Sequence, residues 1–146
     1  MQILHERQKA HTYLPISPEA IERHGTEYNE LQISVNYDLG GMNFFTGKTQ
    51  ERGYRLTISP ITVTKMADGG KIESFTMMGK KWESGLAYFI EGATRYNRKR
   101  LEQLAAQVDE RLQEIATMYE EERDYEILDM VVSLGKDAVK PQPVCA

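Results

Sequence analysis

A strict alternation of hydrophobic and polar positions begins at Leu31. Apolar side chains at Leu31, Ile33, Val35, Tyr37 and Leu39 alternate with polar ones, which is the pattern of a half-buried β-strand. Gly40-Gly41 then turns the chain, residues 42–46 can form a second strand, and residues 47–53 have the composition of a hairpin loop.

A longer strand is expected from Tyr54 onward. Tyr54, Leu56 and Ile58 share one face, but after Pro60 the apolar positions shift by one residue, which predicts a bulge or a bend there. Residues 67–70 form another turn signal, and residues 71–78 return as a strand. Residues 31–79 therefore predict an antiparallel meander of three or four strands.

After Gly79 the hydrophobic period changes to 3.6 residues. It predicts a helix of about 40 residues, which can be interrupted near Gly92. The apolar stripe contains Leu86, Phe89, Ile90, Ala93, Leu101, Leu104, Ala105, Val108, Leu112, Ile115, Ala116 and Tyr119. Residues 127–134 form a last apolar segment, either helix or strand.

The first 30 residues are expected to form a polar, irregular arm that contains one short helix. Ser17 is suited to be its N-cap, Pro18 its first residue and Gly25 its end. The predicted fold class is thus α+β: an arm over 1–30, one domain over 31–134 with the meander followed by the long C-terminal helix, and a flexible tail over 135–146.

Composition places limits on this fold. The chain has 146 residues with 18 Lys and Arg against 22 Asp and Glu, a net charge of -4, and a single cysteine. This length suits one domain, and one cysteine excludes a disulfide framework. With no apolar run of about 20 residues and no apolar segment after the first charges, we expect no membrane partner and a cytoplasmic location.

Motifs for catalysis or metal binding are weak. Residues 41–49 end in Gly47-Lys48-Thr49, but five residues separate the glycines where a phosphate-binding P-loop has four, and a strand rather than a helix follows. His5, His11 and His24 are scattered through the expected arm, so no spacing matches a metal site and no histidine falls inside the predicted sheet or long helix to act as a base. We therefore expect a non-enzyme without a cofactor or a metal.

Two patches combine cations with aromatic rings, as ligands that contain both phosphate and base require. In the first, Lys48, Arg52 and Arg55 are candidate phosphate contacts; the candidate stacking groups beside them are Phe44, Phe45 and Tyr54. The second, with Lys80, Lys81 and Trp82, also includes Arg95 and Arg98, expected to form a second wall of the site. Alternatively, the rings belong to the core and the cations only solvate a helix face.

The charges of the predicted long helix suggest a homodimer. Arg95, Arg98, Lys99 and Arg100 lie near its middle, whereas Glu120, Glu121 and Glu122 lie at its C-terminal end, where the helix dipole disfavours anions. Two antiparallel copies would place basic residues against acidic ones. The alternative is that residues 125–134 fold back and cover the stripe within one chain.

Two stretches carry a resemblance to known proteins: Gly40-Gly41-Met42-Asn43-Phe44-Phe45-Thr46-Gly47-Lys48 and Arg52-Gly53-Tyr54-Arg55-Leu56-Thr57-Ile58-Ser59-Pro60. Over about residues 33–110 the chain resembles small accessory proteins of bacteriophages and mobile elements that have no assigned activity. This resemblance implies the cytoplasm of a bacterial host and a class of short accessory proteins rich in inhibitors and sponges of host defence. The topology of strands followed by a helix also looks like the PC4 and Whirly class of single-strand DNA binders.

The sequence thus favours a non-catalytic homo-oligomer, of phage type, that binds single-stranded nucleic acid or a nucleotide signal, with a role against host defence. The alternative is an anti-CRISPR-like inhibitor that binds a host defence protein through the acidic residues 120–124.

Overall fold

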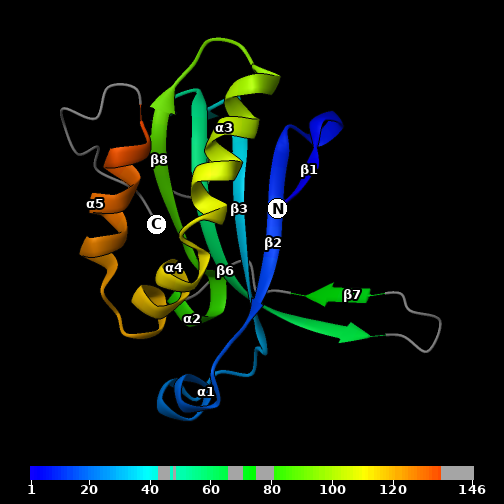
Figure 1. Ribbon diagram of the computed structural model, residues 1–146, viewed down its shortest axis with the longest axis vertical. Helices are drawn as coiled ribbons and strands as arrows, with labels where there is room; N and C mark the ends of the chain where they lie inside the picture. The colour runs from blue at the N-terminus through cyan, green and yellow to red at the C-terminus, as the bar shows by residue number, and fades with distance from the viewer. Residues whose placement is uncertain (43–46, 48, 66–70, 75–80, 136–146) are drawn as a thin grey trace.

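The computed structural model describes residues 1–42, 47, 49–65, 71–74 and 81–135, which form a mixed α+β fold (Figure 1). The elements follow in the order β1 (Gln2–Leu4), the 3-10 helix η1 (His5–Arg7), β2 (Lys9–Pro15), α1 (Pro18–His24), β3 (Glu30–Asp38), β4 (Gly41–Met42), β5 (Thr49–Gln50), β6 (Gly53–Lys65), β7 (Lys71–Ser74), α2 (Lys81–Ser84), β8 (Leu86–Gly92), α3 (Arg98–Asp109), α4 (Leu112–Glu120) and α5 (Asp124–Leu134).

The main sheet is antiparallel, and β6 is its central strand. β1, β2, β3 and β6 are hydrogen-bonded in that order, and β8 pairs with the first part of β6 while β7 pairs with its last part. The apolar positions of β3 and β6 face each other in register, with Val35 opposite Leu56 and Ile33 opposite Ile58. These side chains are fully buried, and α3, α4 and α5 cover this face (Figure 1).

Two local predictions are confirmed. The alternation that begins at Leu31 forms β3, and the short helix forms as α1. The side chain of Ser17 accepts a hydrogen bond from the Ala20 N–H, and Gly25 ends α1 with a φ of 60°. The alternation of β3 and the cap and stop of α1 are both set by residues close together in the sequence. The tertiary structure keeps both of them.

The expectation that residues 1–30 are irregular outside α1 is wrong. β1 and β2 extend the main sheet, and β2 pairs with β3 over seven residues, from Lys9 opposite Asn36 to Pro15 opposite Glu30. Ala10 and Ile16 are buried in the core. The first 16 residues are therefore part of the packed structure.

The single helix of about 40 residues is also wrong. Residues 86–92 form the strand β8, in which Tyr88 and Ile90 are buried. Leu86, Phe89 and Ile90 match a helical period, but Tyr, Phe and Ile also favour strands, and the free edge of β6 selects the strand. The remainder divides into α3 and α4 around Glu110 and Arg111, and residues 124–134 form the helix α5.

The pairing shows no bulge at Pro60, where a bulge or a bend is predicted, but β6 changes its partner on either side of Pro60, from β8 up to Ile58 to β7 from Thr62. The pairing of β3 with β6 continues without a shift from Gly53 to Ile61, through Pro60, whereas the pairing of β6 with β8 shifts between Tyr54 and Arg55. The turn expected at residues 67–70 lies outside the described residues, as does most of the strand expected over 42–46. None of the helices in the described part combines the length and hydropathy needed to cross a bilayer.

A buried ion pair joins β8 to α3. The Arg100 guanidinium donates to the Glu91 carboxylate through Nε (2.9 Å) and Nη2, and the same Nη2 donates to the Leu134 carbonyl of α5 at 2.9 Å. The side chains of Arg100 and Glu91 are only 11% and 5% exposed. One guanidinium therefore links three elements.

We expect Arg100→Met to destabilise the fold by about 3–5 kcal/mol, because Glu91 would stay buried without its cation. The free energy of urea unfolding measures this loss. Arg111→Met is the matched control, because it breaks an exposed pair with Glu114 whose loss costs at most about 1 kcal/mol. Equal losses in the two variants would contradict this role of Arg100.

Candidate ligand-binding end of the sheet

The loop between β8 and α3, residues 93–97, lies at one end of the molecule and is held by tyrosines of the sheet. The Tyr54 hydroxyl accepts from the Asn97 N–H at 2.8 Å and donates to the Asn97 carbonyl at 3.2 Å, and the Tyr37 hydroxyl donates to the Ala93 carbonyl at 3.0 Å. Burial raises the pKa of Tyr54, and the negative charge of Glu91 raises it further. Tyr54 is therefore a neutral anchor for this loop.

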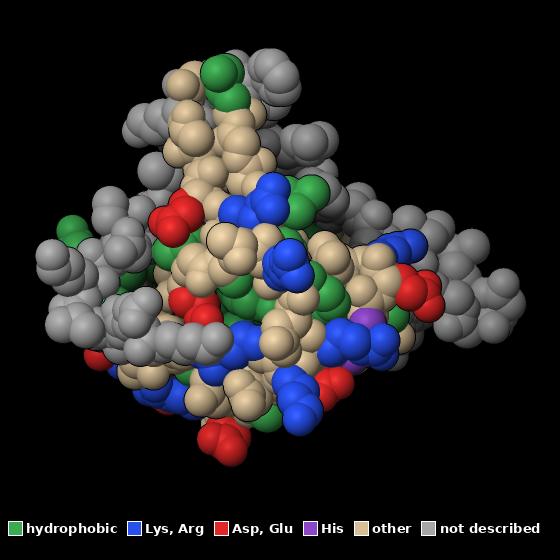
Figure 2. All heavy atoms as spheres, turned by 90° about the horizontal axis from the view of Figure 1, so that it is seen from above, with side chains coloured by type: hydrophobic (Ala, Val, Ile, Leu, Met, Phe, Trp, Pro, Cys, Tyr) green, Lys and Arg blue, Asp and Glu red, His purple; other side chains and the backbone are tan. Residues whose placement is uncertain are grey.

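Three of the predicted cations meet at this loop. Arg52 donates to the Thr94 carbonyl through Nη1 at 3.1 Å and to the Leu39 carbonyl through Nε at 3.3 Å. Arg95 belongs to the loop, Arg98 is the first residue of α3, and the side chains of all three are exposed. Figure 2 looks onto this end and shows Lys and Arg side chains exposed across it, next to a histidine. We call Arg52, Arg95, Arg98 and Lys99 the basic end.

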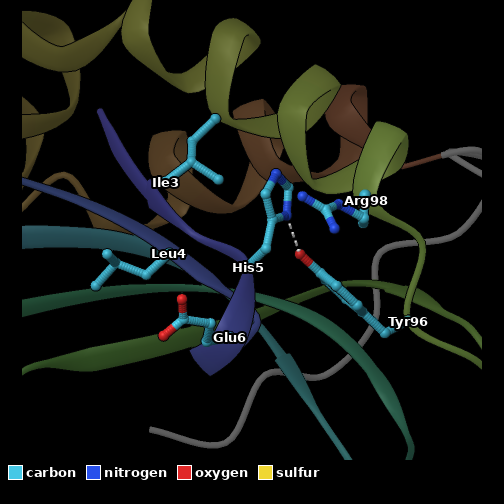
Figure 3. A pocket seen from close by; sticks show the side chains of 6 residues that line it. All are labelled: Ile3, Leu4, His5, Glu6, Tyr96 and Arg98. Carbon is cyan, nitrogen blue, oxygen red and sulfur yellow. Dashed lines mark hydrogen bonds between the residues drawn. The ribbon is translucent and has the colours of Figure 1, made fainter.

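A pocket of about 680 Å³ opens beside the basic end (Figure 3). Its lining comes from two segments far apart in the sequence: Ile3, Leu4, His5 and Glu6 at one side, and Tyr96 and Arg98 at the other. Ile3 and Leu4 give it an apolar wall, Arg98 can pair with an anion, and Glu6 adds one carboxylate to the lining. The pocket can therefore contact both the apolar and the anionic parts of a ligand.

A chain of hydrogen bonds crosses the pocket. The Tyr96 hydroxyl lies 2.6 Å from His5 Nδ1, and His5 Nε2 lies 3.0 Å from the Glu102 carboxylate. A carboxylate only accepts, so Nε2 carries the hydrogen in the neutral imidazole and Nδ1 accepts from Tyr96. The sequence prediction missed this cluster, since it assigned His5 to an irregular arm.

The other predicted site residues are placed differently. Tyr54 is only 1% exposed, so its ring has no free face on which a base could stack. Phe44, Phe45 and Lys48 lie outside the described residues. Within the second patch, Lys81 and Trp82 are separated from Arg95 and Arg98: Trp82 stacks on His24 with ring centres 4.5 Å apart, and Lys81 donates to the Tyr119 carbonyl at 2.6 Å and to Asp124 at 2.8 Å.

Arg55 is buried on the face of β6 opposite to Tyr54. Its Nη2 donates to the Glu51 carbonyl at 2.6 Å, its Nη1 lies 3.5 Å from Asp38, and its guanidinium lies 5.5 Å from the centre of the Phe89 ring. Only 9% of the residue is exposed. These contacts are intramolecular, so Arg55 is less suited to hold a phosphate than Arg98.

The acidic residues 120–124 also have partners within the chain. Glu120 accepts from the Ser17 N–H at 3.0 Å and from its hydroxyl at 2.7 Å, while Glu121 pairs with Arg123. The charge imbalance that suggested an antiparallel dimer is thus largely compensated within the chain, and the long helix on which that geometry depended is absent. The homodimer stays a prediction.

Within the described residues, no group of three or more His, Cys, Asp and Glu is placed to hold a metal ion.

Because Arg55 is buried, we expect Arg55→Ala to lower the free energy of unfolding by about 1–3 kcal/mol, as the Glu51 carbonyl loses its donor and Asp38 its cation. Urea unfolding measures the loss. Arg23→Ala removes an exposed arginine of α1 and should change stability by less than about 0.5 kcal/mol. An Arg55→Ala protein as stable as the parent would show that these contacts contribute nothing.

Comparisons of the chain with protein-family models, with curated proteins and with solved structures find no match. The resemblance to accessory proteins of bacteriophages therefore stays a prediction, and any functional assignment depends on the geometry of this chain.

Proposed function

We propose that this protein binds a phosphate-containing ligand, single-stranded nucleic acid or a nucleotide, at the basic end and its pocket. The observation that carries the proposal is the position of Arg98, an exposed cation that lines the pocket at the same end as Arg52 and Arg95. Tyr96 supplies an aromatic ring beside this cation, and base stacking on such rings contributes about 1–3 kcal/mol.

The charge environment of these arginines supports the proposal. Within the described part of the chain, no carboxylate forms an ion pair with Arg95, Arg98 or Lys99, whereas Arg55, Arg100 and Arg123 all have such partners. Two carboxylates lie near these cations: Glu102 accepts a hydrogen bond from His5, and Glu6 lines the pocket. On a chain with a net charge of -4, a local group of unpaired cations favours an anionic ligand at this end.

The inhibitor hypothesis has less support. It requires residues 120–124 to present free negative charge to a partner protein, but Glu120, Glu121 and Asp124 each have a partner within the chain. The phage origin, the anti-defence role and the bacterial cytoplasm remain predictions that follow from the resemblance.

We expect Arg98→Ala to weaken binding of a short fluorescein-labelled oligodeoxythymidylate, measured by anisotropy over a range of salt concentrations. Loss of one phosphate contact should reduce the slope of log K against log salt by about 0.7. A labelled adenine nucleotide, tested in parallel, distinguishes the two ligand classes. Nucleic acid should show a salt slope larger than that of one mononucleotide.

Arg23→Ala is the control for Arg98→Ala because it makes the same change of charge on α1, at the opposite end of the molecule (Figure 1). It should leave the affinity and the salt slope unchanged. Equal effects of the two substitutions would mean that binding depends only on net charge, which would overturn the proposed site.

A further inference from the structure

The hydroxyl of Tyr96 differs from those of Tyr37, Tyr54 and Tyr119 in the partner that receives its hydrogen bond. The hydroxyls of Tyr37, Tyr54 and Tyr119 donate to the main-chain carbonyls of Ala93, Asn97 and Lys81, which do not take up protons. Tyr96 is instead bonded to His5, an imidazole that can accept a proton outright. A hydroxyl in this position can be activated as a nucleophile.

The two residues behind and beside Tyr96 complete such an arrangement. Glu102 binds the far nitrogen of His5, which holds the ring with Nδ1 toward Tyr96 and stabilises the imidazolium that a proton transfer creates. Figure 3 shows the Tyr96 hydroxyl, the His5 ring and the Arg98 side chain close together at one side of the pocket. A nucleophile, a base, a group that orients the base and a cation for an anionic substrate thus share one site.

We propose that Tyr96 attacks the phosphorus of a phosphodiester bound in this pocket, with His5 as the general base, Arg98 as the phosphate-binding group and Glu102 as a positioning residue. This inference rests on the proposed function, and it goes beyond the non-catalytic role expected from the sequence.

The reaction has two steps, attack by Tyr96 and hydrolysis of the adduct. The Tyr96 hydroxyl proton moves to His5 Nδ1 while the phenolic oxygen forms a bond to phosphorus and the bond from phosphorus to the leaving oxygen breaks. The leaving group departs with the electron pair of that bond and takes the proton from His5, and Arg98 neutralises the non-bridging oxygens. Water then attacks the tyrosyl phosphodiester with His5 as base, and the released phenol recovers its proton.

The environment of Tyr96 explains why the reaction would need His5. Burial raises the pKa of Tyr96, the nearby Tyr54 and Glu102 raise it further, and Arg98 acts in the opposite direction. The free phenol therefore keeps its proton near neutral pH. It becomes a nucleophile only when a base removes that proton as the bond to phosphorus forms.

The test uses bis(p-nitrophenyl) phosphate, whose coloured leaving group reports the first step. We expect the full chain to release p-nitrophenolate and to acquire a covalent adduct on the peptide that contains Tyr96, detected by mass spectrometry. Tyr96→Phe, which removes only the hydroxyl, should lower the rate at least about 100-fold and abolish the adduct. Tyr125→Phe changes a tyrosine that is 85% exposed on α5 and should react like the parent.

The histidine and the glutamate have separate tests. His5→Gln should lose most of the rate and recover part of it when imidazole is added. Glu102→Gln should lower the rate about 10-fold or more. A merely structural role for His5 would give no rescue by imidazole.

The outcomes separate this inference from the proposed function. If the protein binds the labelled oligonucleotide or nucleotide through Arg98 but releases no p-nitrophenolate and carries no adduct on Tyr96, the inference is wrong and the binding function stands. If it neither binds nor reacts, both are wrong. If Tyr96→Phe does not fold, which urea unfolding will reveal, the adduct on the parent protein decides the question.

Discussion

The buried pair of Arg100 and Glu91 is the interaction on which this arrangement depends. A cation in the first turn of α3 is disfavoured by the helix dipole, and a carboxylate with 5% exposure is costly to desolvate. The two charges offset each other, which favours a start of α3 that lies against β8 at this position. The two ends of the loop between β8 and α3 are thereby held at a fixed distance. Tyr37 and Tyr54 of the sheet bind its main chain. Arg95 and Arg98, two of the exposed arginines of the basic end, lie on this segment, which is anchored on both sides.

The elements that could be predicted from the sequence are those specified by close neighbours. The cap at Ser17 and the stop at Gly25 define α1, and the alternation from Leu31 defines β3. The sequence of β8 also suits a helix because residues 86–90 are all hydrophobic, so they fit a period of 3.6 as well as a period of two, and only the unpaired edge of β6 distinguishes the two structures. β2 gave little signal, since its residues alternate between Ala10 and Thr12 on one face and His11 and Tyr13 on the other, without a clear contrast in polarity.

The candidate site divides in the same way. Arg52, Arg95 and Arg98 could be chosen from the sequence because cations near aromatic residues are visible there, and the fold brings them to one end. Glu102 lies four residues after Arg98, so a helix places the two on one face. No short-range sequence pattern, however, connects Arg98 or Glu102 to His5. The pairing of β1 with β2 and of β2 with β3 brings His5 to this place. Tyr54 and Arg55 are less suited to the site than their sequence suggests. Both lie in the middle of the sheet, where polar and aromatic side chains can find hydrogen-bond partners within the chain.

The distance along the chain between the two walls of the pocket has a consequence for how the protein folds. His5 and Tyr96 are 91 residues apart, and Ser17 and Glu120 are 103 residues apart. Contacts of such high sequence separation form slowly, because a long loop must close before they stabilise anything. During synthesis, the two walls of the pocket can therefore meet only after β8 and the start of α3 have left the ribosome. The proposed binding site is in this sense assembled late, long after its first wall has been synthesised.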